Sequence, residues 1–309
     1  MSIRKDGTIK IAAAQASPVF LNREKTVKKA CKLIQKAGSN GAKLIVFPEA
    51  FIPGYPDWIW VVPNSKSQIL NDLYSELVQS AVTIPDKSTE RLCSAARRAK
   101  VNVAIGLNER NSESSNSSLF NTLLFIDDKG KILGKHRKLV PTGGERLIWA
   151  QGDGNTLNIF DTSIGKVGGL ICWENYMPLA RQAIYNMGAQ ILVTPTWDKS
   201  EKWLQSLKHI AREGGIFIVN CCMALRMKDI PERYDFKKLY PEGREWINPG
   251  NSCIINPGGE VITGPVEMKE EILYAQIDLN EIVKSKRMFD VAGHYSRPDV
   301  FEFKVNRNV

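Results

Sequence analysis

The chain has 309 residues, of which 43% are hydrophobic and 24% charged, so it can bury a substantial core. This composition excludes collagen-like, disordered and coiled-coil proteins, and no apolar run approaches the roughly 20 residues that span a bilayer. The formal net charge is +9, but most basic residues alternate with acidic ones on helix-like segments such as residues 22–38. We therefore expect no nucleic-acid partner and no membrane partner, and DNA binding stays a distant alternative that rests on net charge alone.

Short apolar runs rich in Val, Ile and Phe predict β-strands along the whole chain: residues 9–15, 42–50, 101–107, 119–126, 166–173, 189–197, 215–222, 251–257 and 271–279. Segments of helical periodicity lie between several of these strands, at residues 22–39, 86–100, 177–187 and 199–214. Asp-Lys-Gly within residues 125–134 and Pro-Gly-Gly within residues 255–264 supply the turns of two hairpins. The polar stretch 111–118 is predicted to be a mobile loop between strands.

Alternating strands and helices predict parallel strand pairs with helices on the outside, while the hairpins add antiparallel strands to the same sheets. We therefore expect a mixed-sheet α/β protein. No linker or change of composition divides the chain, which favours one domain over residues 1–309 rather than two. Both halves contain a strand–helix–strand unit followed by a hairpin, which suggests a repeat and a sandwich of two sheets.

The cysteines and the start of the chain indicate the compartment. The first residues lack the apolar region of a secretory signal, so the cytoplasm is the expected location. The cysteines are widely spread without CxxC pairs, and we expect free thiols at all six: Cys31, Cys93, Cys172, Cys221, Cys222 and Cys253.

Three polar residues stand at the ends of predicted strands, where ligands of α/β sheets gather: Glu49, Lys138 at the end of the hairpin strand 131–139, and Cys172. Taken singly, each has a structural explanation. A cysteine there is more often a small buried hydrophobe, Glu49 could cap a helix or pair with a surface lysine, and Lys138 would be solvated. Together they suffice for acyl transfer on a thiol, because a carboxylate can accept the thiol proton while an ammonium stabilises developing negative charge.

The sequence offers little support for other kinds of active site. The histidines are His136, His209 and His294, and none has a persuasive claim to act as the base. A dinucleotide-binding enzyme is disfavoured because no GxGxxG follows a strand. The glycine pairs at 143–144, 168–169 and 214–215 lack a third glycine at the required spacing.

Three runs resemble, in their order and spacing, the motifs of the nitrilase (carbon–nitrogen hydrolase) superfamily: FPEAFIPGYPDW at 47–58, KHRKLVPTGGERLIW at 135–149 and GGLICWENYMPLAR at 168–181. The resemblance covers nearly the whole chain, from AAAQASP to GHYSRPDVF. It implies a four-layer αββα sandwich with mixed sheets, a catalytic triad of Glu49, Lys138 and Cys172, and no cofactor or metal. It also implies homodimers or larger homo-oligomers, short spirals included, with the tail at about 284–309 at an oligomer interface.

The residues around the triad resemble the true nitrilase branch. We therefore expect hydrolysis of small organic nitriles to carboxylic acid and ammonia, through a covalent thioimidate and thioester on Cys172. Cyanide hydratases and dihydratases resemble the same branch, and aliphatic amidases use the same triad, so both stay open. A non-catalytic protein of this fold is a distant alternative.

Further site residues follow from the same resemblance. Glu145, seven residues after Lys138, resembles an additional active-site glutamate that orients the lysine or assists the water steps; the alternative is an exposed loop residue. Aromatic walls suit a small, mostly apolar substrate. By analogy the substrate-binding residues are Tyr55, Trp60, Trp149 and Trp173, whereas Trp197 could equally belong to the core.

Overall fold

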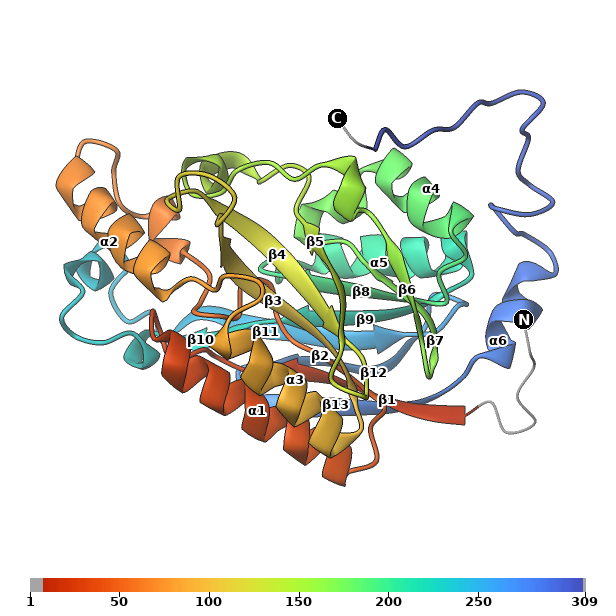
Figure 1. The fold of residues 1–309 in the computed structure, drawn as a ribbon, viewed down its shortest axis with the longest axis horizontal. Coiled ribbons are helices and arrows are strands. Elements are labelled where there is room, and N and C mark those ends of the chain that lie inside the picture. The colour runs from red at the N-terminus through yellow and green to blue at the C-terminus, as the bar shows by residue number, and fades with distance from the viewer. Residues whose placement is uncertain (1–7, 308–309) are drawn as a thin grey trace.

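The computed structural model describes residues 8–307, and two mixed β-sheets form its centre (Figure 1). The first sheet has six strands in the order β13-β1-β2-β3-β4-β5. Their bounds are Glu271–Asp278 for β13, Thr8–Gln15 for β1, Leu44–Val46 for β2, Asn102–Arg110 for β3, Leu119–Ile126 for β4 and Ile132–Arg137 for β5.

The second sheet has seven strands in the order β10-β11-β9-β8-β7-β6, with β12 also paired to β11. Their bounds are Ile159–Thr162 for β6, Gly165–Gly169 for β7, Ile191–Thr196 for β8, Phe217–Cys222 for β9, Ala224–Arg226 for β10, Trp246–Ile255 for β11 and Val261–Glu267 for β12.

Each sheet joins three parallel strands to antiparallel neighbours. In the first sheet β1, β2 and β3 are parallel, whereas β13 and the β4–β5 hairpin are antiparallel to them. In the second sheet β7, β8 and β9 are parallel, and β6 and β11 flank them in the opposite direction. The mixed pairing predicted from strand–helix alternation and from the two hairpins is confirmed.

Helices cover the outer face of each sheet, which makes four layers (Figure 1). Helices α1 (Arg23–Ser39) and α3 (Lys87–Ala99) lie on the first sheet, and α4 (Pro178–Asn186) and α5 (Glu201–Gly214) on the second. Strand β1 is buried on both faces, as a strand in the middle of such layers must be. Ile9, Ile11 and Ala13 face the second sheet, whereas Ala12 and Ala14 face the helices. The predicted αββα sandwich is therefore confirmed.

Local side-chain caps explain why the main helices begin where the sequence predicts. The side chain of Asn22 accepts a hydrogen bond from the N–H of Lys25 at the start of α1, and Ser200 does the same for Trp203 at α5. Asp86 forms a reciprocal capping box at α3. Each cap contributes about 1 kcal/mol to its helix.

Several elements were not predicted from the sequence. Helix α2 (Ser67–Ser80) buries Leu73 and Leu77 fully, and its other apolar side chains pack partly buried against the same core at helical spacing: Ile69, Leu70, Tyr74 and Val78. The short α6 (Asn280–Lys286) and the six 3-10 helices found within residues 8–307 were not predicted either. Residues 111–118 form the predicted loop between β3 and β4.

Two further observations concern the chain as a whole. All six cysteines are free, as predicted. Within residues 8–307, no helix is both long and apolar enough to cross a membrane. Residues 1–7 and 308–309 of the expected single domain lie outside the described residues.

Candidate active site

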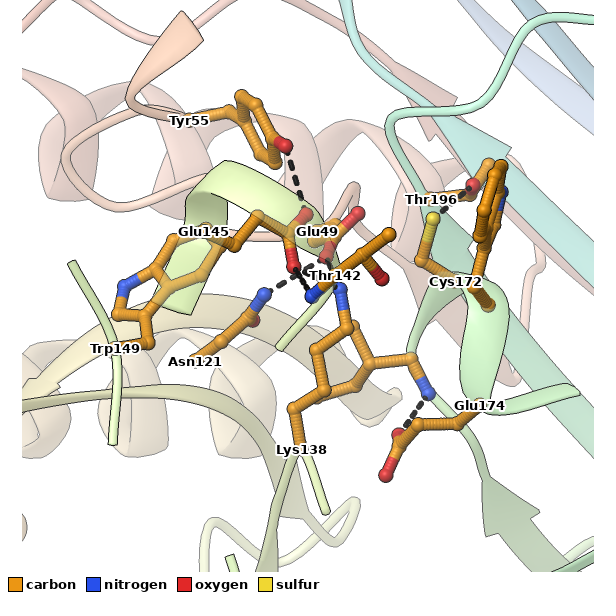
Figure 2. Close-up of polar contacts among 12 residues, drawn as sticks. Glu49, Tyr55, Asn121, Lys138, Thr142, Glu145, Trp149, Cys172, Glu174 and Thr196 are labelled. Carbon is orange, nitrogen blue, oxygen red and sulfur yellow. Dashed lines mark hydrogen bonds and ion pairs between the residues drawn. The ribbon is translucent and has the colours of Figure 1, made fainter. Parts of the chain in front are cut away.

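The three predicted catalytic residues come from both sheets and are buried together (Figure 2). Glu49 lies three residues beyond β2, and Lys138 directly follows β5. Cys172 lies three residues beyond β7 and begins the 3-10 helix η4 (Cys172–Tyr176). Glu49 and Lys138 have no exposed surface and Cys172 is 5% exposed, so the solvated and surface-paired alternatives are wrong.

The ammonium of Lys138 bridges two carboxylates. Its Nζ donates to Oε1 of Glu49 at 2.8 Å and to Oε2 of Glu145 at 2.7 Å. Glu145 lies in the 3-10 helix η2 (Gly143–Leu147) and is only 2% exposed, so it is not an exposed loop residue. Burial lowers the pKa of Lys138, but the nearby negative charges, led by Glu49, outweigh burial and raise that pKa above its ordinary value. The lysine therefore stays charged.

Glu49 has one oxygen that is held and one that is free. Oε1 accepts from Nδ2 of Asn121 at 2.7 Å as well as from Lys138. Oε2 is buried and has no hydrogen-bond partner within residues 8–307. Burial raises the pKa of Glu49 to about 7, against the attraction of Lys138. The carboxyl group therefore changes its charge near neutral pH and has a free oxygen that can accept a proton.

Cys172 is held in an unusual backbone conformation. Its φ of 51° lies in the left-handed region, which residues other than glycine rarely adopt. Nδ2 of Asn175 donates to the carbonyl oxygens of Leu170 at 2.9 Å and of Cys172 at 2.8 Å, and these bonds stabilise the turn. Gly169 before the turn lets the two sheets approach closely, since a Cβ on it would lie 2.4 Å from Cδ2 of Leu123.

The surroundings of the Cys172 sulfur favour the neutral thiol. Oγ1 of Thr196 donates to Sγ of Cys172 at 3.1 Å. Burial raises the pKa of the thiol, and the charge of Glu49 raises it further, whereas Lys138 lowers it. A base must therefore take the thiol proton before or during any nucleophilic attack.

Tyr55 and Trp149, two of the predicted substrate-binding residues, are buried beside the carboxylates. The hydroxyl of Tyr55 donates to Oε1 of Glu145 at 2.7 Å and accepts from Nε1 of Trp60 at 3.2 Å. Trp149 packs edge-on to Tyr55 with 5.6 Å between ring centroids. Trp197 stacks on the Tyr55 ring at 4.3 Å, so it belongs to the same aromatic wall.

Trp60 and Trp173, the other two predicted substrate-binding residues, lie at the surface. They are 47% and 48% exposed, so each keeps an open face. Nε1 of Trp173 donates to Asp198 at 2.8 Å, which orients the ring that follows Cys172.

Sequence reasoning missed the polar residues that support the three predicted ones: Asn121, Thr196 and Glu174. Asn121 and Thr196 lie within apolar strands, and only the tertiary structure brings them to Glu49 and Cys172. Glu174 stands two residues after Cys172, and that proximity was an available signal. Among residues 8–307, no group of three His, Cys, Asp or Glu residues is arranged to hold a metal ion.

Comparison with known proteins identifies the family of this chain. The sequence profile of carbon-nitrogen hydrolases matches residues 10–287. The chain belongs to the carbon-nitrogen hydrolase family. This hydrolase is 40% identical to nitrilase 1 of Arabidopsis thaliana over 97% of its own chain and 88% of that protein. It is 41% identical to a bifunctional nitrilase/nitrile hydratase of Oryza sativa, over 97% of its chain and 84% of that protein.

A solved structure shows the same fold. The carbon-nitrogen hydrolase described here superposes on Nit3 of Saccharomyces cerevisiae, a member of branch 10 of the nitrilase superfamily, with a TM-score of 0.75. The match covers 96% of this chain and 100% of that one at 20% sequence identity. The likeness confirms the predicted fold class.

Proposed function

We propose that this carbon-nitrogen hydrolase converts small organic nitriles into carboxylic acids and ammonia, with Cys172 as the nucleophile. The observation that carries the proposal is the buried cluster in which Lys138 bridges Glu49 and Glu145, whose charges act on the Cys172 thiol. The relatives that are about 40% identical over nearly the whole chain and are named nitrilases support the choice of nitriles.

The first half-reaction forms a covalent thioimidate. Oε2 of Glu49 accepts the thiol proton of Cys172, and the sulfur attacks the nitrile carbon. One electron pair of the carbon–nitrogen triple bond moves to nitrogen, which takes up the proton. The Lys138 ammonium and the main-chain N–H of Trp173, near the start of η4, stabilise negative charge on that nitrogen.

The second half-reaction consumes two waters. Glu49 takes a proton from the first water, which adds to the thioimidate and forms a tetrahedral intermediate. Protonation of nitrogen expels ammonia and leaves a thioester. The second water releases the carboxylic acid and restores the thiol.

Release of an amide is a second candidate outcome. If the tetrahedral intermediate expels the thiol instead of ammonia, one water has been added and the product is an amide. The relative from Oryza sativa, named a bifunctional nitrilase/nitrile hydratase, favours testing for this branch.

Ammonia release from aliphatic, aromatic and dinitrile substrates and from cyanide tests the proposal, with amide and acid measured in parallel. We expect ammonia and acid from at least one nitrile and none from Cys172→Ala. Full activity of that variant would show that Cys172 is not the nucleophile. Activity on amides but not on nitriles would make the protein an amidase.

We propose that Tyr55, Trp60, Trp149 and Trp173 bind the substrate. The ring of Tyr55 contacts those of Trp149 and Trp197, and its hydroxyl contacts Glu145, which supports this assignment. Substitution of each ring by Leu should change KM more than kcat for aromatic nitriles. Unchanged KM values in all four variants would contradict the assignment.

We also propose one domain that assembles into a homo-oligomer through the tail from residue 284. Exposed apolar side chains on that tail support the proposal: Met288, Tyr295 and Phe301 are 67%, 58% and 72% exposed. A cytoplasmic location is proposed because free thiols are typical of reducing compartments. Light scattering of the full chain and of a chain ending at residue 287 tests the assembly. We expect the molar mass of the particle to fall by more than the mass of the deleted residues, because fewer copies of the shorter chain assemble.

A further inference from the structure

Glu174, which lies near Lys138 and Cys172 in Figure 2, joins the two main-chain segments that carry these residues. Its Oε1 accepts from the main-chain N–H of Leu139 at 2.6 Å, and its Oε2 accepts from that of Ile171 at 2.6 Å. Leu139 directly follows Lys138, and Ile171 directly precedes Cys172. One buried carboxylate therefore holds the backbone next to both residues, which come from different sheets.

His136 on β5 holds this carboxylate from the other side. Its Nε2 lies 3.1 Å from each oxygen of Glu174, and its Nδ1 lies 3.2 Å from the carbonyl oxygen of Thr156. A carbonyl can only accept, so Nδ1 carries a hydrogen, and Nε2 facing a carboxylate carries one too. These contacts favour the doubly protonated imidazolium, in which His136 forms a buried ion pair with Glu174.

The charges around the pair agree with this protonation state. Burial lowers the pKa of His136, but Glu174, Thr156 and the more distant Asp153 together raise it above the usual value. Burial raises the pKa of Glu174, but His136 and the two main-chain N–H groups lower it below the usual value.

Such a buried ion pair adds little to the stability of the fold, because desolvation of the two charges costs about as much free energy as their attraction contributes. The pair is better explained by its effect on the position of the backbone. Short charge-assisted hydrogen bonds to a rigid carboxylate define where two backbone segments lie, and one of these segments enters the left-handed residue Cys172.

We propose that Glu174, paired with His136, is a positioning residue that sets the Cys172 sulfur against the Lys138 ammonium and the Glu49 carboxylate. Neither residue touches the reacting atoms. The inference rests on the proposed function for its kinetic consequence, but the geometric consequence for the thiol is independent of which substrate is used.

Glu174→Gln is the direct test. The amide keeps one acceptor oxygen and places an NH₂ against the other main-chain N–H, so one of the two anchors is lost. We expect kcat for nitrile hydrolysis to fall about 10²-fold, because small displacements of reacting groups have effects of this size. KM should change by less than about threefold, since the substrate contacts stay in place.

Glu109→Gln is the matched control. Glu109 is also a buried carboxylate with ion-pair partners on β5, and it accepts from Thr122, Lys135 and Arg137. It has no contact with the main chain beside Cys172. The kcat of Glu109→Gln should stay near that of the wild type. The inference is overturned if kcat falls no more in Glu174→Gln than in Glu109→Gln.

The rate at which iodoacetamide alkylates Cys172, followed on the Cys172 peptide by mass spectrometry, provides a second readout. It should fall about tenfold in Glu174→Gln and stay unchanged in Glu109→Gln. If the wild type releases no ammonia from any nitrile, the proposed function fails, whereas the alkylation rates still decide whether Glu174 positions the thiol.

His136→Gln extends the test to a variant in which the carboxylate remains. The glutamine can still donate to Glu174 but carries no charge, so we expect a smaller loss of kcat and of alkylation rate than in Glu174→Gln. If Glu174→Gln does not fold, as judged by circular dichroism and gel filtration, the kcat and alkylation rate of His136→Gln test the inference instead. Wild-type kcat and alkylation rate in that variant would overturn the inference.

Discussion

Nζ of Lys138 donates to Oε1 of Glu49 at 2.8 Å, while Oε2 of the same carboxylate is buried and has no hydrogen-bond partner within the described part of the chain. The lysine therefore orients Glu49 without occupying its second oxygen. An acceptor for a proton is thus available in a buried site that already contains a cation.

Replacing Glu49 by Gln should remove the base and leave the shape of the site nearly unchanged. We expect kcat/KM for nitrile hydrolysis to fall about 10²- to 10⁴-fold, the usual contribution of a positioned base. Glu270→Gln, which loses a surface carboxylate paired with Lys29, is the control and should keep wild-type activity. More than a tenth of wild-type activity in Glu49→Gln would show that another group takes the thiol proton.

The raised pKa of Glu49 predicts how activity depends on pH. Glu49 accepts a proton only when it is ionised, and its pKa is about 7, so kcat/KM should rise with pH up to about 7. Below that value it should fall about tenfold per pH unit. A pH-rate profile between pH 5 and 9 measures this limb, and a flat profile across pH 7 would rule out Glu49 as the group that titrates.

The raised pKa of Glu49 predicts the opposite pH dependence for stability, which should fall as the pH rises while activity increases. The folded state holds the Glu49 proton more tightly than the unfolded state does, so the contribution of this group to the free energy of unfolding is fully present below pH 4.5. It should be lost as the pH rises through about 7. Urea unfolding of wild type and Glu49→Gln at pH 5 and 8 tests this, and we expect the wild type to lose more stability between the two values.

Glu145→Gln should weaken the electrostatic role of Lys138. The ammonium keeps Glu49 as its only carboxylate partner, and the Tyr55 hydroxyl and the Thr142 N–H lose a charged acceptor. Loss of one preorganised electrostatic group costs about 10²- to 10³-fold in kcat. Single-turnover measurements should show slower thioester formation or hydrolysis, and unchanged rates for both steps would limit Glu145 to a structural role.

Tyr55→Phe should reduce stability through one lost hydroxyl. The phenyl ring can keep its stack on Trp197, but Glu145 loses a donor and Nε1 of Trp60 loses an acceptor. We expect the free energy of unfolding to fall by about 1–2 kcal/mol in urea titrations. Tyr74→Phe is the comparison, since its hydroxyl donates to a surface carbonyl, and its loss should be about 0.5 kcal/mol or less. Equal effects would contradict the buried role of the Tyr55 hydroxyl.

Much of the fold follows from local pattern. The continuous apolar run from Ile11 to Ala14 marks β1 as a strand buried on both faces. Asn22 and Asp86 mark helix starts because their side chains satisfy N–H groups that the helix leaves free. Helix α2 was not predicted although its apolar residues recur at helical spacing and pack on the core, so that signal was available in the sequence.

The candidate site follows from the sequence only in part. The residue types at the ends of three strands, their order and the motifs around them can be read from the chain, because these are properties of contiguous segments. The burial of Lys138, the position of Glu145 opposite it and the contact of Glu174 with the backbone beside Cys172 are visible only once the chain is folded. Desolvation and hydrogen bonds between distant segments set the pKa and the position of each group, and both depend on what surrounds a residue in space.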